Sequence, residues 1–290
     1  MRIELAKSAG FCYGVKRAVE MAEQTTRSEG AVLLGPVIHN DHVVSKLERE
    51  GAVLVREVEE VPDGASVILR SHGEAKCVHD ALEQKGCRII DTACPNVQRI
   101  HRLVAEAEAA GRQPVIIGTP DHPEIVAIAG WCRHPVVLPD GEALSAWLAE
   151  CPERREMPLT LVSQTTSTRK IWDQAIETAK KECTNAEIFD TICNATYIRQ
   201  TEAQELAARC DAMIIIGDRK SSNTKRLSEL CRALCPRVVA IEGAEELEPA
   251  SFAGAASIGI TAGASTPGWI IKEVYDKMSD EIMEIEESFA

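Results

Sequence analysis

The feature that most constrains this chain is a motif that occurs three times, in which a strand pattern ends near a cysteine and a helical pattern follows. The cysteines are Cys12, Cys94 and Cys193. In the middle copy, the apolar run Cys87–Ile90 predicts a buried strand, and Pro95 ends it and favours a helix start. Each thiol is therefore predicted at the carboxyl end of a strand, where open α/β sheets bind ligands. Helix amides at that point also favour thiolate over thiol.

The spacing after these cysteines indicates that the motif belongs to a longer internal repeat. A glycine that ends a second apolar strand follows after 23, 24 and 24 residues, at Gly35, Gly118 and Gly217. Three near-equal spacings indicate a repeated supersecondary unit. Two more strands follow each glycine, predicted at residues 52–55 and 67–73, 134–138 and 159–166, and 237–241 and 258–265. Strands that alternate with helices predict an α/β fold with mostly parallel sheets.

The repeat predicts three α/β units, at residues 13–94, 95–193 and 194–290. The third unit ends without a cysteine strand of its own, so the N-terminal residues 1–12 are predicted to complete it and close the ring. A pseudo-threefold axis through the three units would bring Cys12, Cys94 and Cys193 together.

Composition argues against several classes of protein. The chain has 290 residues, is 45% hydrophobic and carries a net charge of −13, which argues against a broad nucleic-acid surface. No apolar run reaches the length of a membrane span and no signal-peptide pattern is present, so a cytoplasmic location is predicted. Eleven cysteines, an odd number, argue for a reducing compartment rather than a disulfide framework. Most are expected to be inert, including Cys231 and Cys235, which suit a buried helix better than a metal site.

Three thiolates on one axis suit a metal centre, because soft sulfur ligands select zinc, copper(I) or iron–sulfur clusters. A structural zinc site has four ligands and usually a local cysteine pair, whereas each of these thiols stands alone in the sequence. A [4Fe–4S] cluster held by three cysteines fits better. It leaves one iron open for a substrate oxygen, which suggests Lewis-acid as well as electron-transfer chemistry.

Polar loops from all three repeats are predicted beside the same axis. They carry imidazoles, hydroxyls and amides with one glutamate, and they lack a carboxylate pair, a Gly-x-Ser-x-Gly motif and a P-loop. Histidine, serine and threonine near helix amino ends bind phosphate well, so an anionic substrate is predicted. The residues are His39, His42, His72, Asp121, His122, Glu124, Thr165, Thr166, Lys220, Ser221, Ser222, Asn223 and Ser265.

Each of these residues also has an ordinary structural interpretation. Residues 221–223 could simply cap the helix predicted to follow them, and Glu124 could be a first-turn acid that favours a helix dipole. His79, His101 and His134 are interpreted in this way, as surface or satisfied core residues. The functional interpretation is favoured for the others because they recur at equivalent positions of three repeats.

With these motifs the sequence resembles the 4-hydroxy-3-methylbut-2-enyl diphosphate reductases, the last enzymes of the methylerythritol phosphate route to isoprenoids. The resemblance spans essentially the whole chain. The motif around Cys193 is the loosest, because Asn194 stands where an aromatic residue is expected. The motifs are Gly10-Phe11-Cys12-Tyr13-Gly14-Val15, Ile38-His39-Asn40, Ser71-His72-Gly73, Asp91-Thr92-Ala93-Cys94-Pro95, His122-Pro123-Glu124, Gln164-Thr165-Thr166, Cys193-Asn194-Ala195-Thr196, Lys220-Ser221-Ser222-Asn223 and Thr261-Ala262-Gly263-Ala264-Ser265.

The resemblance implies a trefoil of three α/β units around an oxygen-sensitive [4Fe–4S] cluster, with Cys12, Cys94 and Cys193 as its ligands. It implies the reductive dehydroxylation of an allylic alcohol diphosphate to isopentenyl and dimethylallyl diphosphate. Glu124 would deliver protons, and Thr165 would orient the hydroxyl and Glu124. Thr166 is placed in the same substrate pocket. The residues implied to hold the diphosphate are His39, His72, His122, Ser221, Ser222, Asn223 and Ser265.

Two other functions remain open at this point. One is an enzyme like quinolinate synthase, which also combines a pseudo-threefold fold with three cluster cysteines but acts on small carboxylates. The other is a redox sensor that carries a cluster and has no substrate. The many polar loops that converge on one pocket favour an enzyme.

Basic residues recur early in the helix after each key cysteine. They are Lys16, Arg17, Arg99, Arg102 and Arg199. Positive charge there opposes the helix dipole, so helix stability does not explain the recurrence. Ordinary surface charge is one interpretation. The other is a basic collar that steers an acidic electron donor, reduced flavodoxin or ferredoxin, toward the cluster.

Overall fold

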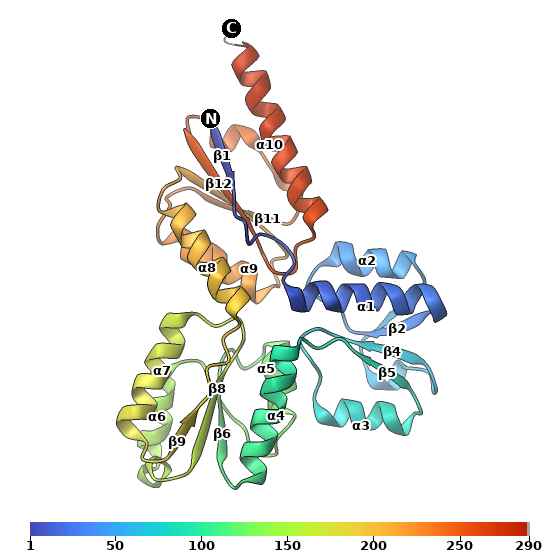
Figure 1. Cartoon of the computed structure of the whole chain (residues 1–290), viewed down its shortest axis with the longest axis vertical. Coiled ribbons are helices and arrows are strands. Elements are labelled where there is room, and N and C mark those ends of the chain that lie inside the picture. The colour runs from blue at the N-terminus through green and yellow to red at the C-terminus, as the bar shows by residue number, and fades with distance from the viewer. Residues whose placement is uncertain (289–290) are drawn as a thin grey trace. The chain divides into compact units, whose positions relative to one another are not determined.

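The computed structural model describes the backbone of residues 1–288 and the side chains of residues 1–280. The part of the predicted third unit beyond residue 288 lies outside the described residues. The strands form three four-stranded parallel sheets, which confirms the predicted α/β class (Figure 1). None of the helices in the described part of the chain has the length and apolar character of a membrane span.

The three sheets have the same strand order, and in each the strand that leads to a key cysteine lies at an edge. In the first sheet the order is β3 (Ala52–Val55), β2 (Ala31–Leu34), β4 (Ser66–Leu69) and β5 (Arg88–Asp91). In the second it is β7 (Val136–Leu138), β6 (Gln113–Ile117), β8 (Leu159–Ser163) and β9 (Ala186–Ile188). In the third it is β11 (Val238–Ile241), β10 (Ala212–Ile216), β12 (Ser257–Ala262) and β1 (Arg2–Leu5).

The third sheet takes its edge strand from the N-terminus. β1 pairs in parallel with β12, with Arg2 opposite Ser257 and Leu5 opposite Ile260. The corresponding pairs in the other sheets are β5 with β4 and β9 with β8. The first two repeats each end with the edge strand that their sheet uses, whereas the third relies on a strand from the start of the chain.

Helices connect the strands as parallel sheets require, because a parallel pair needs a crossover. The α-helices are α1 (Tyr13–Glu29), α2 (Asp41–Arg49), α3 (Lys76–Gln84), α4 (Pro95–Ala109), α5 (Pro123–Ala129), α6 (Gly141–Glu150), α7 (Arg169–Glu182), α8 (Asn194–Ala207), α9 (Ser222–Arg232) and α10 (Gly268–Ser288). Short 3-10 turns lie at Val58–Glu60, Pro152–Arg155, Ala244–Glu246 and Pro249–Phe252.

Residues of one strand alternate between two cores, as the period of a strand demands. Ile214 and Ile216 of β10 pack with α10, while Met213 and Ile215 pack with α8 and α9 on the other face. The second sheet is covered in the same way, by α6 and α7 on one face and α4 and α5 on the other (Figure 1). Both faces of these sheets are therefore buried, which explains the nearly continuous apolar strands.

The chain divides into two compact units. The terminal unit comprises Met1–Lys16, His39–Val44 and Asn194–Ala290, and contains the third sheet. The central unit comprises Arg17–Ile38 and Ser45–Cys193, and contains the first and second sheets. The division into three units at residues 13–94, 95–193 and 194–290 stays a prediction.

Candidate active site

One backbone hydrogen bond recurs at all three key cysteines. The amide N–H of each cysteine donates to a carbonyl in the loop that follows the neighbouring strand β4, β8 or β12. These are the loops in which predicted substrate residues lie. Each cysteine is therefore tied to one substrate loop within its own repeat. The bonds run from Cys94 to Ser71 (3.1 Å), from Cys193 to Thr165 (3.0 Å) and from Cys12 to Ala264 (3.3 Å).

In the central unit, a threonine two residues before each cysteine anchors the loop. Thr92 Oγ1 donates to the Leu69 carbonyl at 2.6 Å. Thr191 Oγ1 donates to the Ser163 carbonyl at 2.6 Å and accepts from the Ser163 N–H at 2.7 Å. Both threonines are buried. Side chain–backbone bonds of this kind satisfy strand-end groups that would otherwise be left unpaired in the interior.

An aspartate one residue earlier completes each loop. Asp91 Oδ1 accepts from the Ala93 N–H at 2.9 Å, and Asp190 Oδ1 accepts from the Ile192 N–H at 3.3 Å. Asp-Thr pairs before a cysteine thus hold two backbone segments in the same shape. The repetition was visible in the sequence, although the bonds that it makes were not predicted.

The Cys94 and Cys193 loops lie together in the central unit. Cys94 is the N-cap residue of α4, and two residues on, Asn96 Nδ2 lies 3.4 Å from Cys193 Sγ. In the terminal unit, the Val15 N–H at the start of α1 lies 3.5 Å from Cys12 Sγ. An N–H group therefore lies within hydrogen-bonding distance of each of these two sulfurs. The three thiols are half-buried, and none of them is in a disulfide.

Glu124 is the most deeply buried acid among the predicted site residues. Its side chain is 3% exposed at the start of α5. Thr165 holds both carboxylate oxygens: its N–H donates to Oε1 and its hydroxyl lies against Oε2, each at 2.6 Å. Burial raises the pKa of Glu124, and the Thr165 hydrogen bonds oppose that rise. Burial is the larger effect, so the carboxyl is biased toward its protonated, proton-donating form.

Two predicted histidines of the central unit face each other. The rings of His72 and His122 lie 5.7 Å apart between centroids in an edge-to-face arrangement. His122 is also the N-cap residue of α5, and its Nδ1 accepts from the Glu124 N–H at 3.1 Å. In a neutral ring this leaves the proton on Nε2, which can donate to an anion. One residue therefore begins the helix that carries Glu124 and offers a donor.

The loop that carries His72 is held against the second sheet's helices. Glu74 forms a partly buried ion pair with Arg70, and its carbonyl accepts from Trp131 Nε1 at 2.9 Å. Burial raises the pKa of Glu74 more than Arg70 lowers it.

His101 stacks on Trp131 with ring centroids 5.0 Å apart, and burial lowers the pKa of His101 to about 4. The neutral ring is thus a core residue, as the sequence predicted.

In the terminal unit, buried polar groups lie at the start of α9 and in the loop after β12. Ser221 is the N-cap residue, and its Oγ accepts from the Thr224 N–H at 3.4 Å. Asn223 is 4% exposed and Ser265 is 6% exposed. Within the part of the chain that the structure describes, neither the Asn223 amide nor the Ser265 hydroxyl has a hydrogen-bond partner. Buried polar groups are normally satisfied, so a ligand is the natural partner at a helix amino end.

The remaining predicted residues are divided between the units. Thr166, in the central unit, accepts from Gln164 Nε2 at 3.1 Å. His39 and Ser222 are half-buried residues of the terminal unit. The loop of His39 lies near the start of α9, because Asp41 is 3.6 Å from Lys220 Nζ. The predicted site residues therefore fall into two groups, with Glu124 and two cysteines in one unit and the serine-rich helix end and Cys12 in the other.

No group of three or more histidine, cysteine, aspartate or glutamate side chains is preassembled for a metal among the described residues. The three-thiol cluster site stays a prediction. The prediction of inert cysteines is better supported: Cys231 and Cys235 are buried, and burial raises the pKa of the Cys231 thiol to about 12. Such a thiol is protonated and unreactive at neutral pH.

The predicted basic collar is wrong at Arg199. That side chain is 3% exposed and donates to two carbonyls in the terminal unit, Ser8 and Gly10. Arg17 is also engaged, since its guanidinium donates to the Ala93 carbonyl at 3.3 Å. Arg99 and Arg102 of α4 are exposed. Helix position alone suggested a surface charge at Arg199, whereas tertiary packing buries it.

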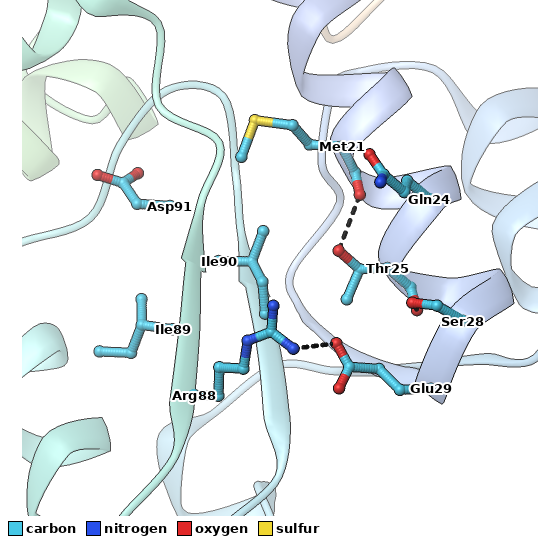
Figure 2. A pocket seen from close by; sticks show the side chains of 9 residues that line it. All are labelled: Met21, Gln24, Thr25, Ser28, Glu29, Arg88, Ile89, Ile90 and Asp91. Atoms are coloured by element: carbon cyan, nitrogen blue, oxygen red, sulfur yellow. Dashed lines mark hydrogen bonds and ion pairs between the residues drawn. The ribbon is translucent and has the colours of Figure 1, made fainter.

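A pocket of about 530 Å³ lies elsewhere in the central unit, between α1 and the edge strand β5. Figure 2 shows Arg88 and Ile90 on the side of β5 that faces α1, with Arg88 directed at Glu29. Asp91 and Ile89 lie on the opposite side of the strand. Of the residues that line it, only Asp91 belongs to a cysteine loop, and none is a predicted substrate residue. The pocket is distinct from the predicted site.

The fold and these loops define a repeat-built α/β protein in which cysteine loops are bonded to the loops of predicted substrate residues and a buried acid is held by a threonine. Comparison with known proteins identifies its family. The sequence profile described as "LytB protein" matches residues 3–279. The chain belongs to this family, and the resemblance inferred from its motifs is confirmed.

Relatives match over nearly their whole length. The chain is 39% identical to the 4-hydroxy-3-methylbut-2-enyl diphosphate reductase of Clostridioides difficile, over 94% of this chain and 98% of that protein. It is 39% identical to the reductase of the same name from Geobacter metallireducens, over 97% and 98%. A solved structure of (E)-4-hydroxy-3-methyl-but-2-enyl diphosphate reductase, the terminal enzyme of the non-mevalonate pathway, is 36% identical with a TM-score of 0.70, over 97% and 100%. The corresponding reductase from Plasmodium falciparum is 25% identical with a TM-score of 0.88, over 95% and 87%.

Proposed function

We propose that this chain reduces (E)-4-hydroxy-3-methylbut-2-enyl diphosphate to isopentenyl diphosphate and dimethylallyl diphosphate. The observation that carries the proposal is its 39% identity, over 94% and 97% of its own length, to proteins that bear this reductase's name. The reaction takes up two electrons and two protons, breaks the C4–O bond and releases the hydroxyl as water. A proton added at one or the other end of the allylic system gives the two products.

Cys12, Cys94 and Cys193 would hold a [4Fe–4S] cluster. The donor set fits, because all three are half-buried thiols outside disulfides at strand ends, and N–H groups lie near two of the sulfurs. When bound, the cluster would supply the electrons and, at an iron without a protein ligand, Lewis acidity toward the departing oxygen. The chain's other residues bind the substrate and move protons.

Glu124 is the proton donor in this proposal. Its burial favours the protonated carboxyl, and a buried acid can give its proton to a leaving hydroxyl without first losing a shell of water. Thr165 holds the carboxyl in one orientation through both its N–H and its hydroxyl. The same hydroxyl can instead donate to the substrate's oxygen, so that Thr165 orients donor and acceptor together.

The diphosphate is assigned to the polar groups of the repeats. Asn223 supplies a buried donor at the start of α9, where the helix dipole also favours an anion, and Ser265 supplies another in the loop after β12. A protein with a net charge of −13 does not attract an anion by its overall charge, so the diphosphate needs local hydrogen-bond donors of this kind. The other residues assigned to the substrate are His39, His72, His122, Thr166, Ser221 and Ser222.

Reduced flavodoxin or ferredoxin is the proposed electron donor, in a cytoplasmic setting. Arg99 and Arg102 support an acidic carrier, because they are exposed basic residues on the helix that begins at Cys94. With Lys16, they are the residues of the predicted collar whose side chains are exposed. The donor's charge would then speed encounter more than it tightens binding.

An anaerobic titration tests the proposal against its two alternatives. The protein is reconstituted with iron and sulfide, and the diphosphate substrate is added while the cluster spectrum and turnover with a reduced dye are followed. We expect a spectral change that saturates with the diphosphate and the release of both five-carbon diphosphates. A response to small dicarboxylates alone would favour a quinolinate synthase-like enzyme. A cluster that responds to oxidant but to no substrate would favour a sensor.

A further inference from the structure

The loop before Cys12 lacks the side chains that hold the other two cysteine loops. The Asp-Thr pairs stand three and two residues before Cys94 and Cys193. At the equivalent positions before Cys12 stand Ala9 and Gly10, neither of which has a polar side chain. Gly10 also has a φ of +98°, and a Cβ added there would lie 3.0 Å from Ile271. The third repeat must therefore hold its cysteine loop by other means.

Helix α8 supplies those means from one face. Arg199 donates through Nε to the Ser8 carbonyl at 3.0 Å and through Nη2 to the Gly10 carbonyl at 2.8 Å. One turn on, Glu202 accepts from the Lys7 and Ser8 N–H groups, each at 2.8 Å, and from the Ser8 hydroxyl at 2.5 Å. Residues three apart on a helix lie on the same side. The Arg199 guanidinium can therefore bind carbonyl groups of the loop while the Glu202 carboxylate binds its N–H groups.

We propose that Arg199 and Glu202 are positioning residues that hold the loop of residues 7–10 so that Cys12 is presented as a ligand. In the terminal unit they do what Asp91 and Thr92 do before Cys94: they satisfy the loop's backbone groups with polar side chains. Arg199 is nearly fully buried, and burying a charge costs free energy unless hydrogen bonds replace those lost to water. The bonds that replace them here also fix the path of the backbone into Cys12.

The assignment of Cys12 as a ligand rests on the proposed function, but the hydrogen bonds of Arg199 and Glu202 to residues 7–10 do not. The first test therefore uses the metal-free protein. Arg199→Met removes both donors at similar length, and amide hydrogen exchange is followed for residues 7–12 and for the Cys94 and Cys193 loops. We expect exchange to rise at least tenfold in residues 7–12 only, together with faster alkylation of Cys12 by iodoacetamide.

Matched variants separate positioning from general stability. Arg209→Met removes an arginine that lies just beyond α8 and pairs with Glu4 of β1 at 2.7 Å, and should leave residues 7–12 protected. Glu202→Gln, which keeps one acceptor, should give an intermediate effect, whereas Glu205→Gln on the exposed side of α8 should give none. Arg199→Lys should partly restore protection. If Arg199→Met unfolds the chain, exchange in residues 7–12 of the Glu202→Gln variant decides whether the proposal holds.

The second test uses the reconstituted protein. We expect Arg199→Met to lower bound iron at least threefold and to alter the electron paramagnetic resonance spectrum, with KM for the diphosphate little changed. Unchanged exchange in residues 7–12 in Arg199→Met and Glu202→Gln, with normal iron content, would overturn the proposal. Exchange that rises equally in all three cysteine loops would also overturn it. If the wild-type protein binds no cluster while exchange in residues 7–12 rises as expected in Arg199→Met, the proposed function is wrong, but the positioning of the loop by Arg199 and Glu202 is supported.

Discussion

Thr165 contacts Glu124 twice, with its N–H and its hydroxyl each 2.6 Å from a different carboxylate oxygen, while its carbonyl accepts from the Cys193 N–H at 3.0 Å. One residue therefore connects the buried acid with the backbone of a predicted cluster ligand. This arrangement fixes the position of the Glu124 carboxyl. It also makes the acid sensitive to changes at residue 165.

The first prediction concerns proton transfer. Glu124→Gln keeps the size of the side chain but removes the acid, so turnover should fall at least about a hundredfold, the low end for a positioned proton donor. The iron content should stay normal, because the substitution leaves the cysteine loops intact. Turnover with reduced dye is measured beside Glu106→Gln, a replacement at an exposed position of α4. Near-normal turnover would mean that the proton has another source, such as the substrate's own diphosphate.

Glu124 should also affect stability in a pH-dependent manner. Because burial raises its pKa, the folded state binds this proton more tightly than the unfolded state does. Its contribution to stability is therefore fully present below the unfolded pKa, about 4.3, and is lost as the pH rises through the raised folded value. The free energy of unfolding of the wild-type protein minus that of Glu124→Gln should fall between pH 4 and pH 8 in urea titrations. A difference independent of pH would contradict the burial argument.

His101 should show the opposite dependence. Burial lowers its pKa to about 4, so the unfolded state binds the proton more tightly below pH 6.5, and stability is lost as the pH falls through that range. Between pH 7 and pH 5 this loss is about 2 kcal/mol. His101→Phe keeps a ring to stack on Trp131 and should abolish that part of the loss in urea titrations. His134→Gln, at a position with an 82% exposed side chain, should not.

The sequence predicted the strands of the three sheets well because their information is local. Runs such as Ala52–Val55 carry their own strand propensity, and the cysteine-to-glycine spacing places them in equivalent units. The burial of the Arg199 side chain cannot be predicted from local sequence. Its burial depends on the path of residues 8–10, which are distant in sequence, so a reading of helix positions assigned it to the surface. The one available signal was the absence of an Asp-Thr pair before Cys12.

The candidate site shows the same limit. Residue types and recurrence predicted which loops carry Glu124, Thr165 and Asn223. They did not predict that Thr165 bonds both carboxylate oxygens or that the Asn223 amide is buried without a partner in the described residues. Ser221 is both a cap, as the ordinary interpretation held, and a neighbour of the unpartnered groups. Capping and substrate binding are therefore compatible uses of one helix end.

The thiols provide a further prediction. Replacement of Cys12, Cys94 or Cys193 by serine should each lose the cluster's absorbance or most of the turnover, because a hydroxyl is a poor substitute for a soft thiolate ligand. Cys231→Ala and Cys235→Ala remove buried thiols outside the cysteine loops and should keep iron, sulfide and activity, with lower thermal stability. Loss of the cluster in either control would contradict the choice of ligands.

A prediction at Ser265 separates substrate binding from stability. Asn223 and Ser265 bury polar atoms without partners in the described residues, so Ser265→Ala should leave the free energy of unfolding unchanged or raise it by up to about 1 kcal/mol. The same substitution should raise KM for the diphosphate about tenfold or more, since a bond to a charged group is lost. Ser228→Ala, at a buried serine of α9 outside the predicted site, is the control. An unchanged KM would return this segment to helix capping alone.

The last prediction concerns the electron donor. Arg99 and Arg102 lie on the helix that begins after Cys94, and their exposed charges stand out in a chain with a net charge of −13. Arg99→Glu with Arg102→Glu should slow turnover with reduced flavodoxin about tenfold at low salt and weaken its salt dependence, because steering acts on the rate of encounter. Turnover with a small reduced dye should not change. Lys180→Glu with Lys181→Glu makes the same change of charge on α7 and should leave both electron sources unaffected. Equal losses with flavodoxin and dye would show that these arginines serve the cluster or the fold instead of the donor.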